Sequence, residues 1–281
     1  MRILLSLLLA VCALLPSRGA RGNVVVTVQT VLGPFDIELF DAVAPLTVAN
    51  FLAYTDPVGG ASYDQSIIHR SVPTFVIQGG GFRVSGGQVV ALTPTAPPTV
   101  PNEPGLPNVR GTLAMAKASG QPNSATTQWF VNVTDNPELD TDNGGFTVFA
   151  EVISGLSVVD AINARPRVNA GVPFHELPTV NWTAPDPCCA ISQLVVLTSV
   201  ARRTTPLCGD LNADSQINAA DVARLRSALA NPSGSALTPG EASRCSVVGN
   251  ATDCNVLDST IVRRRLAGRI PHRLQICTAA L

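Results

Sequence analysis

Hydrophobic and polar residues alternate along much of the chain, which is the pattern of half-buried β-strands. Residues 24–40 form two such runs around a Gly-Pro pair and predict a β-hairpin. Further strands are predicted at 67–82, 111–118, 128–134, 146–152 and 191–201. Before residue 204, only 44–55 and 156–164 have apolar residues at helical spacing. Residues 83–109 are rich in Pro, Gly and Thr and are predicted to be irregular. Many strands with only two helices favour a closed β-barrel capped by helices.

The composition changes after Arg203, and we place a domain boundary at 204–207. The first domain is predicted to span 23–203. Residues 206–277 are predicted to form a small α-helical domain, in which 221–230 and 259–268 are the helices. This domain is small enough to need disulfides, and it contains cysteines at 208, 245, 254 and 277.

The N-terminus has the features of a secretory signal peptide. Arg2 is followed by an apolar run, 3–15, which ends at Pro16 and precedes small residues suited to cleavage. The run is too short for a membrane anchor. We therefore expect residues 1–20 to be a signal peptide and the mature chain to be periplasmic or extracellular.

Six cysteines follow the signal peptide, and an even number in an oxidising compartment indicates disulfides. Their connectivity is open, since six cysteines allow fifteen pairings. Cys188 and Cys189 are adjacent, and we expect at least one of them to pair with another segment.

Charge gives no indication of a polyanionic partner. The formal net charge is −1, and 14% of the residues are charged. We therefore expect neither nucleic acid nor an anionic membrane as a partner.

Four segments resemble the cyclophilins, in family order and across about residues 24–201. The signature stretch IIHRSVPTFVIQGGGF at 67–82 carries the resemblance most clearly. APLTVANFLAYT resembles the first helix of that family, RGTLAMAKA with SATTQWFVNV the central strands, and FTVFAEVISGLSVVDAI the last strand and helix. The resemblance implies a mainly β fold: a closed eight-stranded barrel with two capping helices.

The resemblance also implies peptidyl-prolyl cis–trans isomerase activity on proline-containing polypeptides, with no cofactor for catalysis. Arg70 and Gln78 match the catalytic arginine and its partner glutamine. The positions that match the substrate-binding groove are Phe75, Val76, Ala116, Lys117, Phe130, Leu139 and Phe146. Val76 stands where the family usually has methionine, and Glu138 where many members have tryptophan.

Without the resemblance, these residues have ordinary structural interpretations. An arginine on a strand is usually solvated, and the phenylalanines would be core residues. In a single strand Arg70, Val76 and Gln78 share one face, whereas Phe75 falls on the other unless the strand bends near Pro73. His69 is interpreted as a structural histidine.

The second domain contains a candidate calcium loop, CGDLNADSQINAAD. Oxygen ligands at alternating positions wrap a hard cation, and a helix follows the last of them. The predicted ligands are Asp210, Asn212, Asp214, Gln216 through its carbonyl, Asn218 and Asp221. The alternative is an acidic surface loop.

This pattern resembles a type I dockerin repeat, whose partner is a cohesin module. A second repeat keeps Asp258 but has Val247, Gly249 and Ala251 at ligand positions, so one calcium ion is expected. A cohesin-like partner and a merely calcium-stiffened accessory domain remain alternatives.

Two functions are therefore predicted. The first is an isomerase that accelerates X–Pro isomerisation in exported proteins. The second is a non-catalytic scaffold that holds proline segments in the same groove and attaches through the dockerin-like domain.

Overall fold

The computed structural model describes residues 24–55, 61–94, 99–183, 188–203, 211 and 219–230. In chain order, its strands and helices are β1 (Val25–Thr30), β2 (Gly33–Leu39), α1 (Pro45–Thr55), β3 (Ser66–Ile67), β4 (Arg70–Val72), β5 (Val76–Gly79), β6 (Phe82–Ser85), β7 (Gln88–Ala91), β8 (Thr112–Met115), β9 (Trp129–Asn132), β10 (Val148–Ser154), α2 (Leu156–Asn163), β11 (Arg167–Val168), β12 (Leu177–Pro178), β13 (Val196–Arg202) and α3 (Ala219–Ala230). Short 3₁₀ helices lie at Pro137–Asp140, Asp142–Gly144 and Ile191–Gln193.

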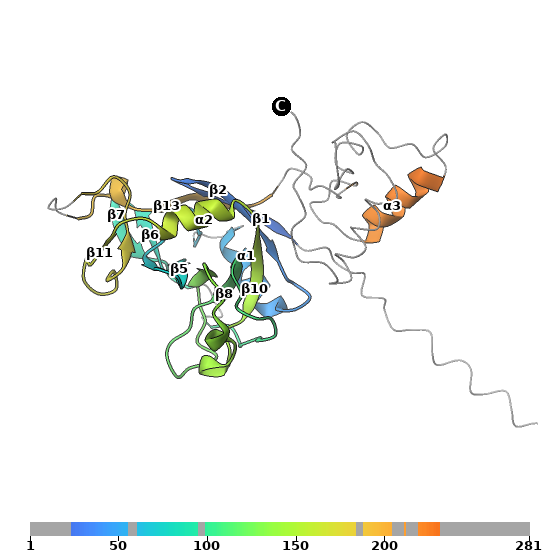
Figure 1. Ribbon diagram of the computed structural model, residues 1–281, viewed down its shortest axis with the longest axis horizontal. Helices are drawn as coiled ribbons and strands as arrows, with labels where there is room; N and C mark the ends of the chain where they lie inside the picture. Colours follow the sequence, from blue (N-terminus) through green and yellow to red (C-terminus); the bar gives the residue numbers. More distant parts are fainter. Residues whose placement is uncertain are drawn as a thin grey trace, which may run out of the picture.

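One curled antiparallel sheet forms most of the structure (Figure 1). Its order is β4-β5-β9-β8-β10-β2-β1-β13-β3-β6-β7, and β11 pairs with β12 in a separate two-stranded sheet. The main sheet thus has eleven strands among the described residues, where eight were predicted. Two regions contain more strands than the alternation predicted: the signature stretch holds three strands in place of one, and the segment that follows adds β6 and β7.

The signature stretch is not the single strand that the sequence predicted. It is broken into β3, β4 and β5, and β4 pairs with β5 as an antiparallel hairpin. The turn lies at Pro73 and Thr74, and Thr74 has a φ of 54°. Between β3 and β4, the Ile68 amide donates to Val195, while the His69 amide donates to Gln78. The amides of two consecutive residues thus bond to two different segments, Ile68 to the one before β13 and His69 to β5.

The predicted irregular segment 83–109 begins with a second hairpin, which the sequence analysis missed. β6 and β7 pair from Phe82 with Ala91 to Ser85 with Gln88. Gly86 and Gly87 form the two-residue turn, with φ values of 57° and 76°. Turns of this kind need positive φ at both positions, which explains the glycine pair.

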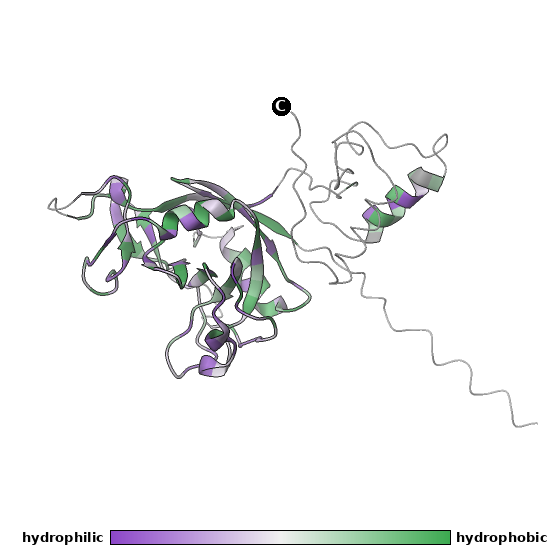
Figure 2. Ribbon diagram, in the orientation of Figure 1, coloured by the Kyte–Doolittle hydropathy of each residue, from purple (hydrophilic) through white to green (hydrophobic). Residues whose placement is uncertain are grey.

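The main core contains apolar residues from the strands and both helices α1 and α2, and Figure 2 shows that apolar residues occur along all of these elements. Ile77, Leu113 and Val131 of three neighbouring strands face it. Trp129 is fully buried in it and lies edge-on to Phe51 of α1. α1 therefore packs on the inside of the sheet, while α2 packs against β2, β4 and β5.

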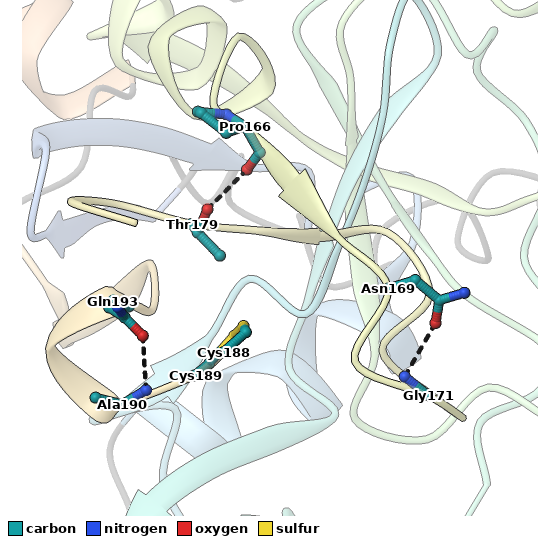
Figure 3. The surroundings of a disulfide bond; sticks show 8 residues. All are labelled: Pro166, Asn169, Gly171, Thr179, Cys188, Cys189, Ala190 and Gln193. Atoms are coloured by element: carbon teal, nitrogen blue, oxygen red, sulfur yellow. Dashed lines mark hydrogen bonds between the residues drawn. A yellow bond between two sulfur atoms is a disulfide. The ribbon is translucent and has the colours of Figure 1, made fainter. Parts of the chain in front are cut away.

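A second apolar cluster supports the β11–β12 arm, which we define as residues 164–180. The buried members of this cluster are Ile67, Val168, Leu177, Leu194 and Val196, and Cys188 and Cys189 pack against them. The structure joins Cys188 to Cys189 as a disulfide (Figure 3), contrary to the expectation from sequence.

Of the second domain, the structure describes Leu211 and helix α3. The first predicted helix, 221–230, is confirmed and begins two residues earlier, at Ala219. The other predictions for this region lie outside the described residues: the second helix, the cysteines at 208, 245, 254 and 277, and every calcium ligand except Asp221. The predicted signal peptide lies outside them as well. The helices that are described are all too short or too polar to cross a bilayer.

Candidate active site

A row of cross-strand neighbours on the convex side of the sheet forms the centre of the site. Arg70 of β4 lies directly opposite Gln78 of β5, and Gln78 lies opposite Phe130 of β9. Phe130 in turn is opposite Ala114 of β8. Directly opposite residues point to the same face of a sheet, so the guanidinium, the amide and the phenyl ring adjoin one another.

Arg70 and Gln78 therefore share a face for a different reason from the one the sequence suggested. They are not on one strand at even spacing; they are paired across the β4–β5 hairpin. The turn at Pro73 also answers the question about Phe75, which lies at the end of the turn and joins the same apolar cluster as Val76.

The Arg70 guanidinium contacts two side chains. Its Nη1 donates to Oε1 of Gln78 over 3.3 Å, and its Nε donates to Oε2 of Glu176 over 3.0 Å. The side chains of Arg70 and Glu176 are 39% and 38% exposed, so a ligand can reach this pair from solvent.

Gln128 extends the polar row. The Gln78 Nε2 donates to Gln128 Oε1 over 2.8 Å. The side chain of Gln128 also hydrogen-bonds to buried His69. Gln78 is thus oriented with its carbonyl oxygen toward Arg70 and its amino group toward Gln128.

The predicted pocket residues lie in one apolar cluster beside this polar row. Its buried members are Phe40, Val76, Ala114, Phe130, Leu139 and Val148, with Phe75, Leu106, Ala116 and Phe146 packed against them. The rings of Phe130 and Phe146 meet edge-on with centroids 5.7 Å apart. Because Phe75, Ala116 and Phe146 are only partly buried, part of the cluster is exposed to solvent, and we call this exposed apolar surface the recess.

Lys117 does not extend its ammonium into this recess. Its Nζ donates to the carbonyl oxygens of Asn143 at 2.9 Å and Gly145 at 2.7 Å, and to Asn102 Oδ1 at 3.2 Å. The ammonium also lies 4.7 Å from the centroid of the Phe146 ring. Partial burial lowers the pKa of Lys117 below its usual value. The side chain of Lys117 thus fixes the loop that carries Phe146, one wall of the recess.

An open pocket shares Leu106 and Phe146 with the apolar cluster. Its volume is about 360 Å³, and it is lined by residues 104–107, Asp140 and Phe146. Asp140 Oδ1 accepts hydrogen bonds from the backbone and side chain of Asn108, which fixes this carboxylate in the cavity wall.

Sequence reasoning missed Gln128 and Glu176. Gln128 is the first residue of the predicted strand 128–134, two positions before Phe130, so the spacing alone could have placed it near the site. Glu176 is 106 positions from Arg70 and lies in a segment with no predicted structure, so no local pattern pointed to it.

The sequence is similar to known proteins of one family. The model of the cyclophilin type peptidyl-prolyl cis-trans isomerase family matches residues 25–183. A peptidyl-prolyl cis-trans isomerase of Acinetobacter baylyi is 41% identical over 163 residues, which cover 57% of this chain and 82% of the relative. Peptidyl-prolyl cis-trans isomerase B of Escherichia coli is 43% identical, covering 52% of this chain and 88% of its own. A solved cyclophilin-type isomerase of Cryptosporidium parvum is 24% identical with a TM-score of 0.48, covering 66% of this chain and 99% of its own.

The curled sheet with a polar row beside an apolar recess thus belongs to the class of proline isomerases. The chain is a member of the cyclophilin family, and it is a peptidyl-prolyl cis–trans isomerase.

Proposed function

We propose that this enzyme isomerises X–Pro bonds in exported polypeptides, with Arg70 as the catalytic residue and Gln78 as its partner. The observation that carries the proposal is the row of Arg70, Gln78 and Phe130 across three adjacent strands. This row brings a cation and an amide to the edge of an apolar recess. A prolyl residue needs both, a dry surface for its ring and a polar group for its amide.

The chemistry required is rotation about a bond with partial double-bond character. The barrier is about 18–20 kcal/mol, and the uncatalysed reaction takes tens to hundreds of seconds. A donor that hydrogen-bonds the prolyl nitrogen lone pair favours the twisted amide, in which that lone pair is no longer delocalised. Arg70 would thereby bind the transition state more tightly than the planar ground state.

The apolar recess is proposed to hold the proline ring while the amide turns. Phe130, Leu139 and Phe146 belong to the same apolar cluster as Val76 and are proposed to contact the ring. Valine is shorter than the methionine usual in the family, so this part of the recess is less filled. The residue before the proline is proposed to lie outside the recess, beside the polar row, so that it can rotate about the X–Pro bond.

The rate of isomerisation tests this proposal. Arg70→Ala should lower kcat/KM on an Ala-Pro peptide by about 100-fold, the usual effect of removing a group that stabilises developing polarity. Exposed Arg202 on β13 provides the matched control, and Arg202→Ala should keep the wild-type rate. Circular dichroism of each variant checks that the fold is retained.

The alternative function, a non-catalytic scaffold for proline segments, predicts a different result. If wild type and Arg70→Ala both gave rates near the uncatalysed background, the catalytic proposal would be overturned. The groove would then act only as a binding surface.

Export and attachment are proposed from sequence. The signal peptide pattern at 1–20 supports export, and the loop pattern supports a calcium-binding domain at 206–277 with a cohesin-like partner. One feature of the described residues fits calcium: Asp221 is 1% exposed, and its Oδ1 accepts the Leu211 amide over 2.7 Å. The start of the loop and its final carboxylate are thus in contact, as a loop wrapped around a cation requires.

A further inference from the structure

The β11–β12 arm reaches back to the strand that carries Arg70. The arm leaves α2, and its two short strands pair at Arg167 with Pro178 and Val168 with Leu177. Its second strand packs against β4. The Ser71 amide donates to the Glu176 carbonyl oxygen over 2.8 Å, so the backbone of Glu176 is fixed beside that of Arg70.

The arm is held in place by contacts away from the polar row. Thr179 donates through its hydroxyl to the Pro166 carbonyl over 3.0 Å, which fastens the base of the arm (Figure 3). Val168 and Leu177 are buried in the cluster that also contains the Cys188–Cys189 pair. Asn163, the last residue of α2, donates to the Ser71 hydroxyl and to the Val72 carbonyl oxygen. The arm is thus an anchored element next to β4.

Glu176 and Gln78 hold the guanidinium of Arg70 from two sides. Glu176 accepts from Nε over 3.0 Å, and Gln78 accepts from Nη1 over 3.3 Å. A guanidinium has five N–H donors in one plane, and these two bonds use two of them. They fix the plane of the group while three donors, including both of Nη2, remain for a substrate.

We propose that Glu176 is a positioning residue that orients Arg70 for catalysis, which rests on the proposed role of Arg70. An arginine side chain has many rotamers, and a donor accelerates a reaction only when it is already directed at the reacting atoms. The ion pair is half-exposed, and pairs of this kind contribute little to stability. Its effect is therefore on the orientation of Arg70, and removing the carboxylate leaves the fold intact.

Steady-state kinetics of the full chain tests the proposal with three variants of the arm. Glu176→Ala should lower kcat/KM about tenfold through kcat, because the substrate recess is unchanged. Glu176→Gln keeps an oxygen that can accept from Nε, and should recover most of the activity. His175→Ala changes the exposed neighbour on the same arm and should leave both constants at wild-type values.

The Nε–Hε resonance of Arg70 in nuclear magnetic resonance spectra gives a direct readout of orientation. This resonance is assigned to Arg70 because it is missing from the spectrum of the Arg70→Ala variant. In Glu176→Ala it should move toward the position of a free arginine and exchange faster with water, and in Glu176→Gln it should stay near its wild-type position.

A double variant separates this inference from the proposed function. In an Arg70→Ala background, Glu176→Ala should have no further effect, because its partner is already gone. Loss of activity in Arg70→Ala with wild-type kcat in Glu176→Ala would overturn the positioning role and leave Arg70 catalytic. A further tenfold loss in the double variant, or an equal loss in His175→Ala, would also overturn it. Full activity in Arg70→Ala would overturn the proposed function itself.

Discussion

His69 and Arg70 are neighbours in the chain, but their side chains lie in opposite environments. Arg70 is half-exposed in the polar row, whereas His69 is 3% exposed, with its ring edge-on to Phe82. Burial lowers the pKa of His69 from 6.5 to about 4, although a hydrogen bond to Gln128 acts in the opposite direction. His69 is therefore neutral at pH 7, and the interpretation as a structural histidine is confirmed.

The buried neutral His69 makes stability depend on pH. Between about pH 4 and 6.5 the unfolded chain holds a proton on this residue that the folded chain does not. The free energy of unfolding should therefore decrease as the pH falls through this range, by up to about 3 kcal/mol. In His69→Gln this part of the decrease should disappear, as measured by urea unfolding at about pH 7 and about pH 4.5.

The exposed His175 is the control for that experiment. His175→Gln should show the same pH dependence of stability as wild type. An equally steep decrease in wild type and His69→Gln would contradict the assignment to His69.

At the scale of single residues, the sequence predicted the members of the site but not all of its contacts. Phe75, Val76, Phe130, Leu139 and Phe146 were placed together by resemblance, and the structure gathers them in one cluster. Lys117 was predicted to line the groove, and that role stays a prediction, but the contacts of its ammonium with the Asn143 and Gly145 carbonyl oxygens were not foreseen. No sequence pattern contains that information, because the acceptors are backbone oxygens whose direction depends on the folded loop.

At the scale of elements, the β4–β5 hairpin determines the site. It places the two residues of the polar row opposite each other and brings Phe75 out at the turn. β5 ends at Gly79, and the glycines at 79 and 80 lie close to the buried ring of Trp129. Gly80 has a φ of 77°, and a Cβ at this position would contact the Thr127 carbonyl oxygen and lie 2.9 Å from Trp129 Cδ1.

Gly80→Ala is therefore expected to be strongly destabilising, by about 3 kcal/mol or more. The loss has two parts, the positive φ and the collision with the backbone of residue 127. Gly87 has nearly the same φ, 76°, but nothing lies within 4 Å of the position that an added methyl group would take, so Gly87→Ala should lose only about 1 kcal/mol. Denaturant unfolding measures both, and equal losses would show that the collision is absent.

The elements that the sequence predicted well are those whose signal is local. The first helix begins at Pro45 and ends at Thr55, and α2 ends one residue before the predicted position. The β6–β7 hairpin was missed because its segment is rich in Pro, Gly and Thr, a composition that indicates a loop. The break within 67–82 was missed for a different reason. Alternation continues through a tight turn, so periodicity alone does not separate one long strand from two short ones.

At the scale of the whole molecule, the two faces of one sheet have different tasks. Residues such as Ile77 and Val131 point to the concave core, while their neighbours Gln78 and Phe130 point to the site. A second domain is predicted after β13, at 206–277. Its predicted calcium site can be tested independently of the isomerase site.

Calcium should stabilise that second domain. In excess calcium the thermal midpoint of its unfolding should be about 5 °C or more above the midpoint in chelator, because the ion binds only the folded loop. Asp214→Ala should abolish the difference. Asp258→Ala, in the degenerate second repeat, is the matched control and should keep it. Identical midpoints in calcium and chelator would exclude a calcium site.

Lys117 is the only lysine in the chain, and its ammonium is enclosed by three oxygens and an aromatic ring. Apart from the α-amino group, every reagent that acylates amines therefore has a single target in this enzyme. The amine becomes a nucleophile only after it loses its proton, and its hydrogen bonds to the Asn143 and Gly145 carbonyl oxygens are expected to slow that reaction. The rate of acylation at Lys117 therefore measures how readily this ammonium leaves the carbonyl oxygens of loop 142–145.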